Sequence, residues 1–275
     1  VAVVVGKNAL LNEVRKEIHK TFAYDRLRLA VFPPALVIEN VRSLTEPPAL
    51  RARRVRIEVP YLSLLRNRKS LSVVIDSPEI HVVPPASAAS RTRPRRPLSV
   101  LSLPFIIERG LIENGSFVYA AGAATLEARG VRALVTQDGE NFAVRATAES
   151  SAYVPRGKTL QPLGGLTILL SGKGDDVAIE KLAVDGPGLT VGAEGRVRSL
   201  SEPTIEIDAR FDVDTGYLDS VLHMPFDWKG RVSGEGRLER KDGRLSFVTS
   251  LGSETLALAG VPMGSLRGRF ELLPE

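Results

Sequence analysis

Apolar and polar residues alternate along most of the chain from about residue 24 onward. Between Thr204 and Asp214, every second residue is apolar, and the residues between them are polar or charged. A β-strand places these two sets on opposite faces, whereas a helix would mix them around its circumference. The same period of two residues occurs at 54–59 and 266–272. The pattern predicts a mainly β protein.

Shorter runs rich in aliphatic residues predict further strands. The segments 185–188 and 242–243, which combine Asp and Gly, are turn signals between such runs. Successive runs lie roughly 10 to 14 residues apart, which is close to the spacing of meandering antiparallel strands. The runs lie at 71–75, 142–148, 166–170, 177–184, 189–197, 245–251 and 256–258.

An internal repeat relates residues 41–62 to residues 197–218, with nine identities in 22 positions and no gap. Both copies run from a strand end through Ser-Leu-x-Glu-Pro into an alternating strand. Both then reach a Tyr-Leu segment, 61–65 or 217–222, that predicts one helical turn. Chance similarity between two β segments is the alternative. Stacked repeats build elongated sheets rather than closed globules.

The first residues predict a helix ahead of the strands. Residues 1–5 are apolar and are followed by Gly6 and Lys7, as in the last turn of a membrane helix, although about 20 residues are needed to cross a bilayer. A short buried start is the alternative. Residues 8–22 carry apolar side chains at helical spacing and charged ones on the other side, which predicts an amphipathic helix. Packing on the sheet is the favoured interpretation, and a position at a membrane surface is the alternative.

Composition and charge narrow the functional classes. The chain has 275 residues and no cysteine, which excludes a disulfide scaffold, a zinc–thiolate site and a thiol enzyme. Residues 1–100 contain 18 Lys or Arg against 8 Asp or Glu, whereas residues 101–275 contain 19 against 24. Four arginines at 51, 53, 54 and 56 lack the interleaved aromatic residues of a nucleic-acid platform. A solvated face, or one near anionic headgroups, is the favoured interpretation.

No constellation in the sequence predicts catalysis, a cofactor or a metal. His19, His81 and His223 lie on separate predicted elements. A Gly-Lys-Thr sequence at 157–159 lacks the leading glycine that a phosphate-binding loop requires. We therefore expect a protein that is not an enzyme and carries no cofactor.

Three aspartates on one predicted strand face are the nearest approach to a cation site. Asp208, Asp212 and Asp214 alternate with apolar residues, so their side chains are expected to point the same way. Calcium sites normally gather their ligands from a tight loop, so a solvated strand face is the favoured interpretation.

Several segments together resemble the N-terminal part of the bacterial AsmA-like family, which includes TamB and YhdP. The first is Val55-Arg-Ile-Glu-Val59, followed by 61–68 and then by 71–81. The later glycine-punctuated segments at 182–186, 189–197 and 230–238 are similar to strands of the same family. The resemblance spans nearly the whole chain.

The resemblance implies a single-pass anchor in the bacterial inner membrane, followed by a β-region in the periplasm. Members of the family extend as a long, curved β-sheet with an apolar channel. Their implied role is bridge-like phospholipid transport toward the outer membrane, and TamB-like members are also linked to the assembly of outer-membrane β-barrels. The implied partners are phospholipid acyl chains, the inner membrane and an outer-membrane or periplasmic protein, with no nucleic acid.

We therefore expect an elongated, curved antiparallel β-sheet that forms an open hydrophobic groove, with an N-terminal amphipathic helix and short helical turns. Acyl chains would cover the apolar face if no second layer does, since covered apolar surface contributes roughly 25 cal/mol per Å². A closed barrel or sandwich and an interaction scaffold with exposed strand edges are the alternatives. The expected groove lining is Val55, Ile57, Val73, Ile75, Leu189, Val191, Ile205, Ile207, Phe211, Val213, Phe247, Leu258, Leu266 and Phe270.

The expected organisation has four parts. Residues 1–22 form the end of a membrane anchor and the amphipathic helix, and residues 23–85 form a first β-unit. Residues 86–104, rich in Pro and Arg, form a linker. Residues 105–275 form the repeat region of the β-groove.

Overall fold

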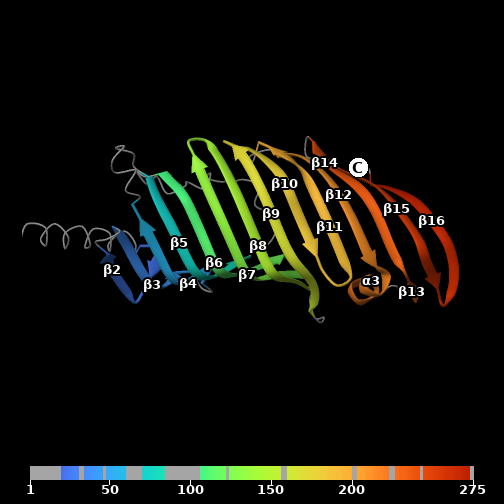
Figure 1. Cartoon of the computed structure of the whole chain (residues 1–275), viewed down its shortest axis with the longest axis horizontal. Helices are drawn as coiled ribbons and strands as arrows, with labels where there is room; N and C mark the ends of the chain where they lie inside the picture. Colours follow the sequence, from blue (N-terminus) through green and yellow to red (C-terminus); the bar gives the residue numbers. More distant parts are fainter. Residues whose placement is uncertain are drawn as a thin grey trace, which may run out of the picture. The chain divides into compact units, whose positions relative to one another are not determined.

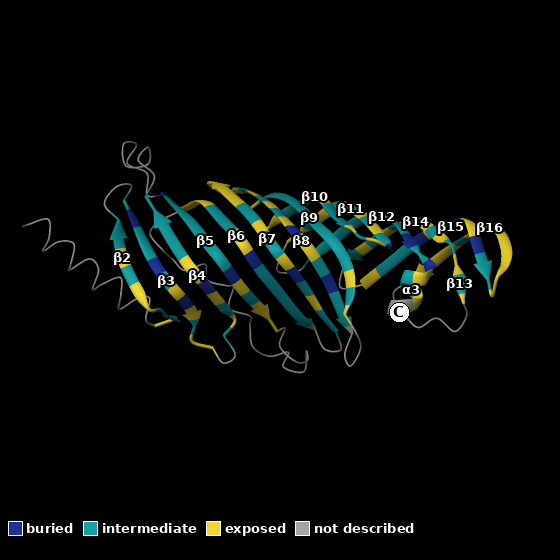
Figure 2. Cartoon of the chain, turned by 60° about the horizontal axis from the view of Figure 1, so that its bottom comes forward, coloured by how far each residue is buried: buried dark blue, intermediate teal, exposed yellow. Residues whose placement is uncertain are grey.

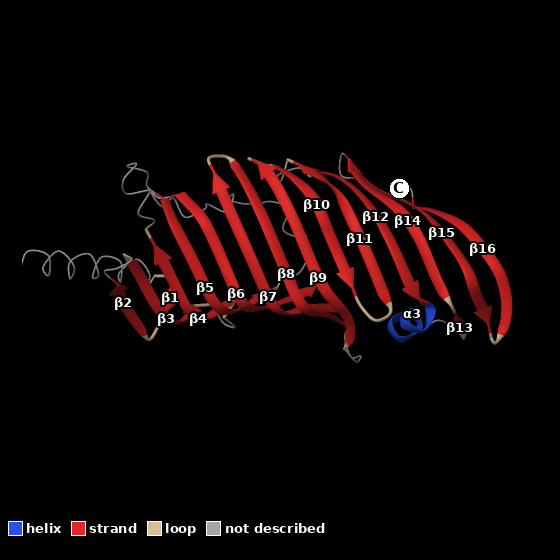
Figure 3. Cartoon of the chain, viewed as in Figure 1, coloured by secondary structure: helices blue, strands red, loops and turns tan. Residues whose placement is uncertain are grey.

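The computed structural model describes residues 20–30, 34–45, 48–59, 70–83, 106–121, 124–155, 160–199, 203–222, 227–241 and 244–272. Within these ranges the chain is built from strands and one helix, α3 (Thr215–Leu222) (Figures 1 and 3). The strands are β1 (Phe22–Ala23), β2 (Arg26–Ala30), β3 (Ala35–Ser43), β4 (Leu50–Glu58), β5 (Ser70–Val82), β6 (Ile106–Ala121), β7 (Ala124–Asp138), β8 (Asn141–Pro155), β9 (Gln161–Lys173), β10 (Asp176–Asp185), β11 (Leu189–Arg198), β12 (Thr204–Asp214), β13 (Trp228–Lys229), β14 (Arg231–Lys241), β15 (Arg244–Leu258) and β16 (Val261–Leu272).

The strands form one mixed sheet of 16 strands, which confirms the mainly β prediction. Its hydrogen-bonded order is β1-β3-β4-β5-β6-β7-β8-β9-β10-β11-β12-β14-β15-β13, with β2 beside β3 and β16 beside β15, and the described strands do not close it into a ring. The expectation of a wholly antiparallel sheet is wrong at one place, because β5 and β6 run parallel. More than a dozen residues separate these two strands, which is the length that a parallel connection needs.

The chain divides into two compact units. The first comprises residues 1–125 and 129–137, and the second comprises residues 126–128 and 138–275. The first unit therefore holds β1 to β6, and the second holds β8 to β16 and α3. β7 contributes residues to both.

Residues with a left-handed backbone conformation lie in one row across the first unit. Asn40 in β3 and Ser77 in β5 have φ values of 53° and 51°, and the neighbouring register pairs place both of them beside Arg53 of β4. Asn114 of β6, with φ of 53°, continues the row beyond Ser77. Asn is one of the few residues other than Gly that readily adopts this conformation. We call Asn40, Arg53, Ser77 and Asn114 the bend row.

The alternation of side chains breaks at the bend row. Buried Ile38 and Val41 are three residues apart, and so are buried Ala52 and its partner in the same cluster, Val55. Side chains of a straight strand alternate every two residues. β3 and β4 therefore each turn two successive side chains outward at the bend row, and they bend there. Ile38, Val41 and Ala52 form the core of the unit on the inner side of the bend. Buried segments recur on successive strands in Figure 2.

The predicted N-terminal helix is wrong at its end. Residues 8–19 lie outside the described residues, but Lys20 and Thr21 form a turn and Phe22 begins β1. Phe22 pairs with Ser43 and packs against the core of the first unit, so tertiary contact overrides the helical spacing of its apolar neighbours. The linker 86–104 also lies outside the described residues.

The strand bounds in the structure agree best with the predicted bounds where the apolar–polar alternation is regular. β12 has the bounds predicted from its pattern, and the predicted helical turn at 217–222 is confirmed by α3. The predicted runs at 245–251 and 256–258 belong to a single strand, β15. The Tyr-Leu segment of the other repeat copy, 61–65, lies outside the described residues.

The two repeat copies share an order of elements but not a register. Each places a strand end and then an antiparallel strand in succession. Val41 pairs with Ala52, eleven residues on, whereas Val197 pairs with Ile205, eight residues on. The similarity therefore describes local strand and turn chemistry and does not extend to equivalent pairing.

Asp214 caps α3 and supplies a direct test of this local structure. Its Oδ1 accepts hydrogen bonds from the backbone N–H groups of Gly216 at 2.8 Å and Tyr217 at 3.2 Å. We expect Asp214→Ala to lower the free energy of unfolding by about 1 kcal/mol, because two helical donors lose their partner. Asp214→Ser keeps an acceptor and should recover most of the loss in urea unfolding. Equal losses for both variants would contradict the capping role.

Candidate functional site: the apolar face of the sheet

The strands of the second unit share one apolar face. Residues that are directly opposite in a ladder point to the same side of the sheet. In β11 and β12, Leu189 stands opposite Val213 and Val191 opposite Phe211. The registers of the other strands extend this face from β9 to β16. We call it the apolar face.

Nine of the ten lining residues predicted in this unit lie on the apolar face. Leu258 is the tenth and lies beyond register shifts in β15, so the ladder alone does not place it with the others. The side-chain direction of the nine follows from uninterrupted pairing through β11, β12, β14, β15 and β16. The nine are Leu189, Val191, Ile205, Ile207, Phe211, Val213, Phe247, Leu266 and Phe270.

The four lining residues predicted in the first unit also share a face. Val55 stands opposite Ile75, and Ile57 stands opposite Val73. Val55 and Ile75 pack against the buried core of that unit, on the inner side of the bend. All four side chains are half-buried.

Glycines on the apolar face make room for aromatic rings. A Cβ at Gly234 would lie 2.6 Å from Cζ of Phe211, and a Cβ at Gly172 would lie 2.4 Å from Cζ of Phe142. Each ring therefore lies against bare backbone of the neighbouring strand. The sequence pattern marks these glycines as strand punctuation but does not reveal their role as seats for the rings.

Protein covers the apolar face unevenly. Val213 is 6% exposed, whereas Leu266 is 48% and Phe270 is 61% exposed. Among the described residues of this unit, α3 is the only helix, and it contacts β12 and β13. Its Tyr217 lies against Gly188 in the turn before β11, and burial raises the pKa of the Tyr217 phenol. The helix therefore fills one end and does not roof the sheet.

The opposite face of the second unit is charged. Asp208 stands opposite Arg237, and Arg210 stands opposite Glu235, with 3.3 Å between Arg210 Nε and Glu235 Oε1. Arg237 Nε donates to Glu239 Oε1 at 2.6 Å, and this bond, followed by the charge of Asp208, raises the pKa of Arg237. Exposed pairs of this kind contribute little stability each. We call this surface the charged face.

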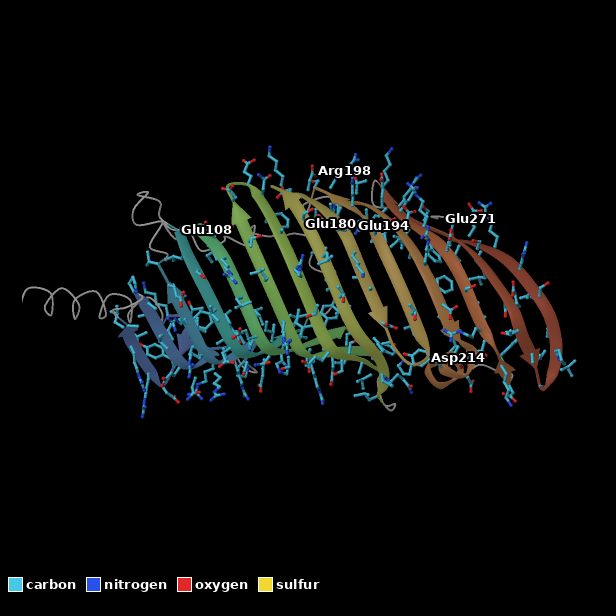
Figure 4. All side chains as sticks on the ribbon, in the orientation of Figure 1. Glu108, Glu180, Glu194, Arg198, Asp214 and Glu271 are labelled. Carbon is cyan, nitrogen blue, oxygen red and sulfur yellow. The ribbon has the colours of Figure 1, made fainter. Side chains whose placement is uncertain are left out.

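A cleft of about 1020 Å³ lies on the charged face. Glu180 and Glu194 project from neighbouring strands beside it (Figure 4). The groove expected on the apolar face remains a prediction, since the lining of this cleft belongs to the other side of the sheet. The charged residues that line it are Glu180, Lys181, Glu194, Asp208, Arg210, Glu235, Arg237, Glu239 and Arg269.

The three aspartates considered as cation ligands have other partners. Asp208 lies 3.9 Å from Arg237, Asp212 accepts a hydrogen bond from Arg231 Nε at 2.6 Å, and Asp214 caps α3. In the described part of the chain, no group of three or more His, Asp or Glu side chains is placed to hold a metal ion. Of the three histidines, His81 is exposed in β5, and the other two lie outside the described residues, as does the segment 157–159.

Comparisons with known proteins leave the family open. No helix among the described residues is both long enough and apolar enough to cross a membrane. No family model and no curated protein matches the chain. The resemblance to the AsmA-like family therefore stays a prediction that rests on the quoted segments.

Proposed function

We propose that the chain is a non-catalytic phospholipid carrier of the bacterial envelope, related to the AsmA-like proteins. In this proposal the sheet is an elongated, curved groove in the periplasm, attached to the inner membrane. Acyl chains move along the apolar face toward the outer membrane while headgroups stay in water. The continuous, register-linked apolar face of β9 to β16 carries the proposal.

The energetics of the apolar face favour an acyl occupant. Each methylene removed from water contributes about 0.8 kcal/mol, so a chain lying against several strands gains many such increments. Most residues on this face are aliphatic, aromatic or glycine and offer a guest no polar partner, although Thr249 and Arg240 also lie on it. A surface with few polar partners favours sliding over tight capture, because apolar contacts are not directional.

Lipid analysis of the purified full chain tests the proposal. We expect extraction and native mass spectrometry to find phospholipid bound to protein prepared in several detergents. Protein that is consistently lipid-free would contradict the proposal. Fatty acid or detergent alone in place of phospholipid would also count against it.

Adjacent residues on opposite faces sharpen this test. A photo-crosslinking amino acid at Val191 points to the apolar face, and one at Gly192 points to the charged face, where a Cβ meets no atom within 4 Å. We expect lipid adducts in cells from position 191 and not from position 192. Equal labelling at both positions would place the lipid outside the apolar face.

A second candidate function is a scaffold for the assembly of outer-membrane β-barrels. β16 pairs only with β15 among the described strands, and it exposes Val261, Leu266 and Phe270. An unpaired edge strand can add a strand from another chain through backbone hydrogen bonds. Crosslinking from Leu266 distinguishes the two functions, since the scaffold predicts adducts with an unfolded barrel protein and the carrier predicts adducts with lipid.

A further inference from the structure

The bend row places four arginines of β4 on one surface. In a straight strand, Arg51 and Arg53 would point away from Arg54 and Arg56. Ala52 and Val55 both pack in the core of the first unit, so the inward positions of β4 are three residues apart. Arg53 and Arg54 consequently both point outward, and the alternation on each side of them turns Arg51 and Arg56 the same way.

Neighbouring strands enlarge this surface. Arg26 and Arg28 of β2 stand opposite outward-facing Glu39 and Val37 of β3, and Arg42 of β3 stands opposite Arg51. The outer face of β2 to β5 thus presents seven arginines against four acidic residues, Glu39, Glu58, Asp76 and Glu79. We call the seven the arginine patch: Arg26, Arg28, Arg42, Arg51, Arg53, Arg54 and Arg56.

Within the described residues only two members of the arginine patch make close ion pairs, although Glu39 and Asp76 stand opposite Arg54 and Glu79 stands opposite Arg51. Arg28 pairs with Glu39 at 3.5 Å and Arg56 pairs with Glu58 at 2.5 Å. The other five arginines make no ion pair with the described part of the chain, and all five are exposed. Arg42 and Arg51 directly oppose each other, and like charges at opposed positions destabilise a ladder. An external anion would relieve this repulsion.

We propose that the arginine patch docks the first unit on an anionic phospholipid surface. The outer side of a bend is convex, so Arg53 on the bend row and its neighbour Arg54 would reach a flat surface first. No lysine occurs in β2 to β5, and the planar guanidinium binds two phosphate oxygens at once, which an ammonium does not. These strands also contain no Phe, Tyr or Trp on which nucleic-acid bases could stack. The inference does not depend on lipid transport, because headgroup phosphates rather than acyl chains make the contact.

Vesicle flotation with the full chain tests the docking surface. We expect the chain to float with vesicles that contain phosphatidylglycerol and to remain behind with vesicles of phosphatidylcholine alone. Substituting Arg51, Arg53 and Arg54 together with Gln should weaken partitioning at least about tenfold, since each basic residue near an anionic surface contributes measurably. Salt at about 1 M should abolish the binding of the unmodified chain, because charges are then screened beyond about 3 Å.

A matched variant controls for net charge. Arg244, Arg267 and Arg269 lie on the charged face of the second unit, and replacing them with Gln removes the same charge. We expect this control to float like the unmodified chain. Substituting Lys for Arg51, Arg53 and Arg54 preserves charge but removes the two-oxygen contacts, so it should retain more binding than the Gln triple and less than the unmodified chain. Circular dichroism should be unchanged in all three variants.

Three outcomes would overturn the docking proposal. They are equal binding to both vesicle types, equal weakening by the two glutamine triples, and tighter binding to single-stranded RNA than to anionic vesicles at the same salt. Flotation measures association with the vesicle surface and does not measure bound lipid. An unmodified chain that floats with anionic vesicles but contains no bound phospholipid would therefore count against the transport proposal alone. If the glutamine triple at Arg51, Arg53 and Arg54 still contains bound phospholipid but no longer floats, the docking proposal is supported and the transport proposal is unaffected.

Discussion

Replacing Ile207 and Phe211 with aspartate is expected to abolish phospholipid uptake while strand content stays unchanged. Both side chains lie on the apolar face, where Ile207 stands opposite Leu238 and Phe211 opposite Val191. A carboxylate against an acyl chain must lose water without gaining a partner, which costs several kcal/mol. We expect the phospholipid extracted from the variant to fall at least about a hundredfold, which corresponds to about 2.7 kcal/mol in affinity. Far-UV circular dichroism checks that the strand content is unchanged.

The control for this double variant adds the same charge to the opposite side of the sheet. Ala178→Asp and Gly192→Asp place two carboxylates on the charged face, opposite Arg196 and Arg210. Uptake should match the unmodified chain, because neither position contacts the apolar face. Undiminished uptake in the Ile207 and Phe211 variant would show that lipid binds elsewhere, and equal loss in both variants would point to a general effect of negative charge.

The second large effect is expected from Gly164→Ala in β9. Gly164 has φ of 94°, and a Cβ built there would lie 2.1 Å from the carbonyl oxygen of Asp185 and 2.4 Å from Cα of Gly186. Both are backbone atoms at the end of paired β10, so no side chain can rotate to relieve the contact. We expect the free energy of unfolding to fall by about 3 kcal/mol or more, measured by urea denaturation.

Two other glycines of the same unit separate backbone strain from steric contact. Gly174 has φ of 56°, and a Cβ added there would meet no atom within 4 Å, so Gly174→Ala should cost only about 1 kcal/mol, from the left-handed conformation. Gly192 has free space and no left-handed φ, so Gly192→Ala should be neutral or slightly stabilising. A loss at Gly174 equal to that at Gly164 would show that contact with β10 contributes nothing.

A strand with uninterrupted alternation was predicted over its whole length, whereas strands with a bend were predicted only in part or not at all. β12 alternates without interruption and has its predicted bounds. The pattern predicts two runs in place of β15 because the inward residues Ser253 and Leu256 are three apart, which breaks the period within a continuous strand. Ser253 is held by a hydrogen bond from its hydroxyl to the carbonyl oxygen of Arg231 at 2.6 Å, a contact that no local pattern reveals.

The same physics explains what was missed in the first unit. β6 contains Gly110, Asn114 and Gly115, which are turn-forming residues, and the pattern predicts no strand there. Asn114 instead takes its left-handed conformation inside the strand, in line with Asn40 and Ser77. Their alignment depends on the register of strands distant in sequence, so the gathering of the β4 arginines on one side could not be foreseen.

The sharing of one face by the apolar residues was predictable, and the cleft was not. Alternation assigns Ile205 and Ile207 to a common face, and antiparallel pairing then carries that face from strand to strand. The cleft beside Glu180 and Glu194 could not be predicted, because it depends on sheet curvature and on where long charged side chains leave space. The parallel pairing of β5 with β6 was equally hidden, since alternation carries no information about strand direction.

The charges of β12 and β14 also disfavour one alternative alignment of these two strands during folding. Displacing β14 by two residues would preserve the apolar face, so hydrophobic burial alone does not reject this error. In one direction the displacement would set Arg210 against Arg237, Asp212 against Glu235 and Asp208 against Glu239, which are all like-charge pairs. The native alignment pairs Asp208 with Arg237 and Arg210 with Glu235, and it keeps one like-charge pair, Glu206 with Glu239. A surface whose ion pairs add little to equilibrium stability thus disfavours displacement of the apolar strands in this direction.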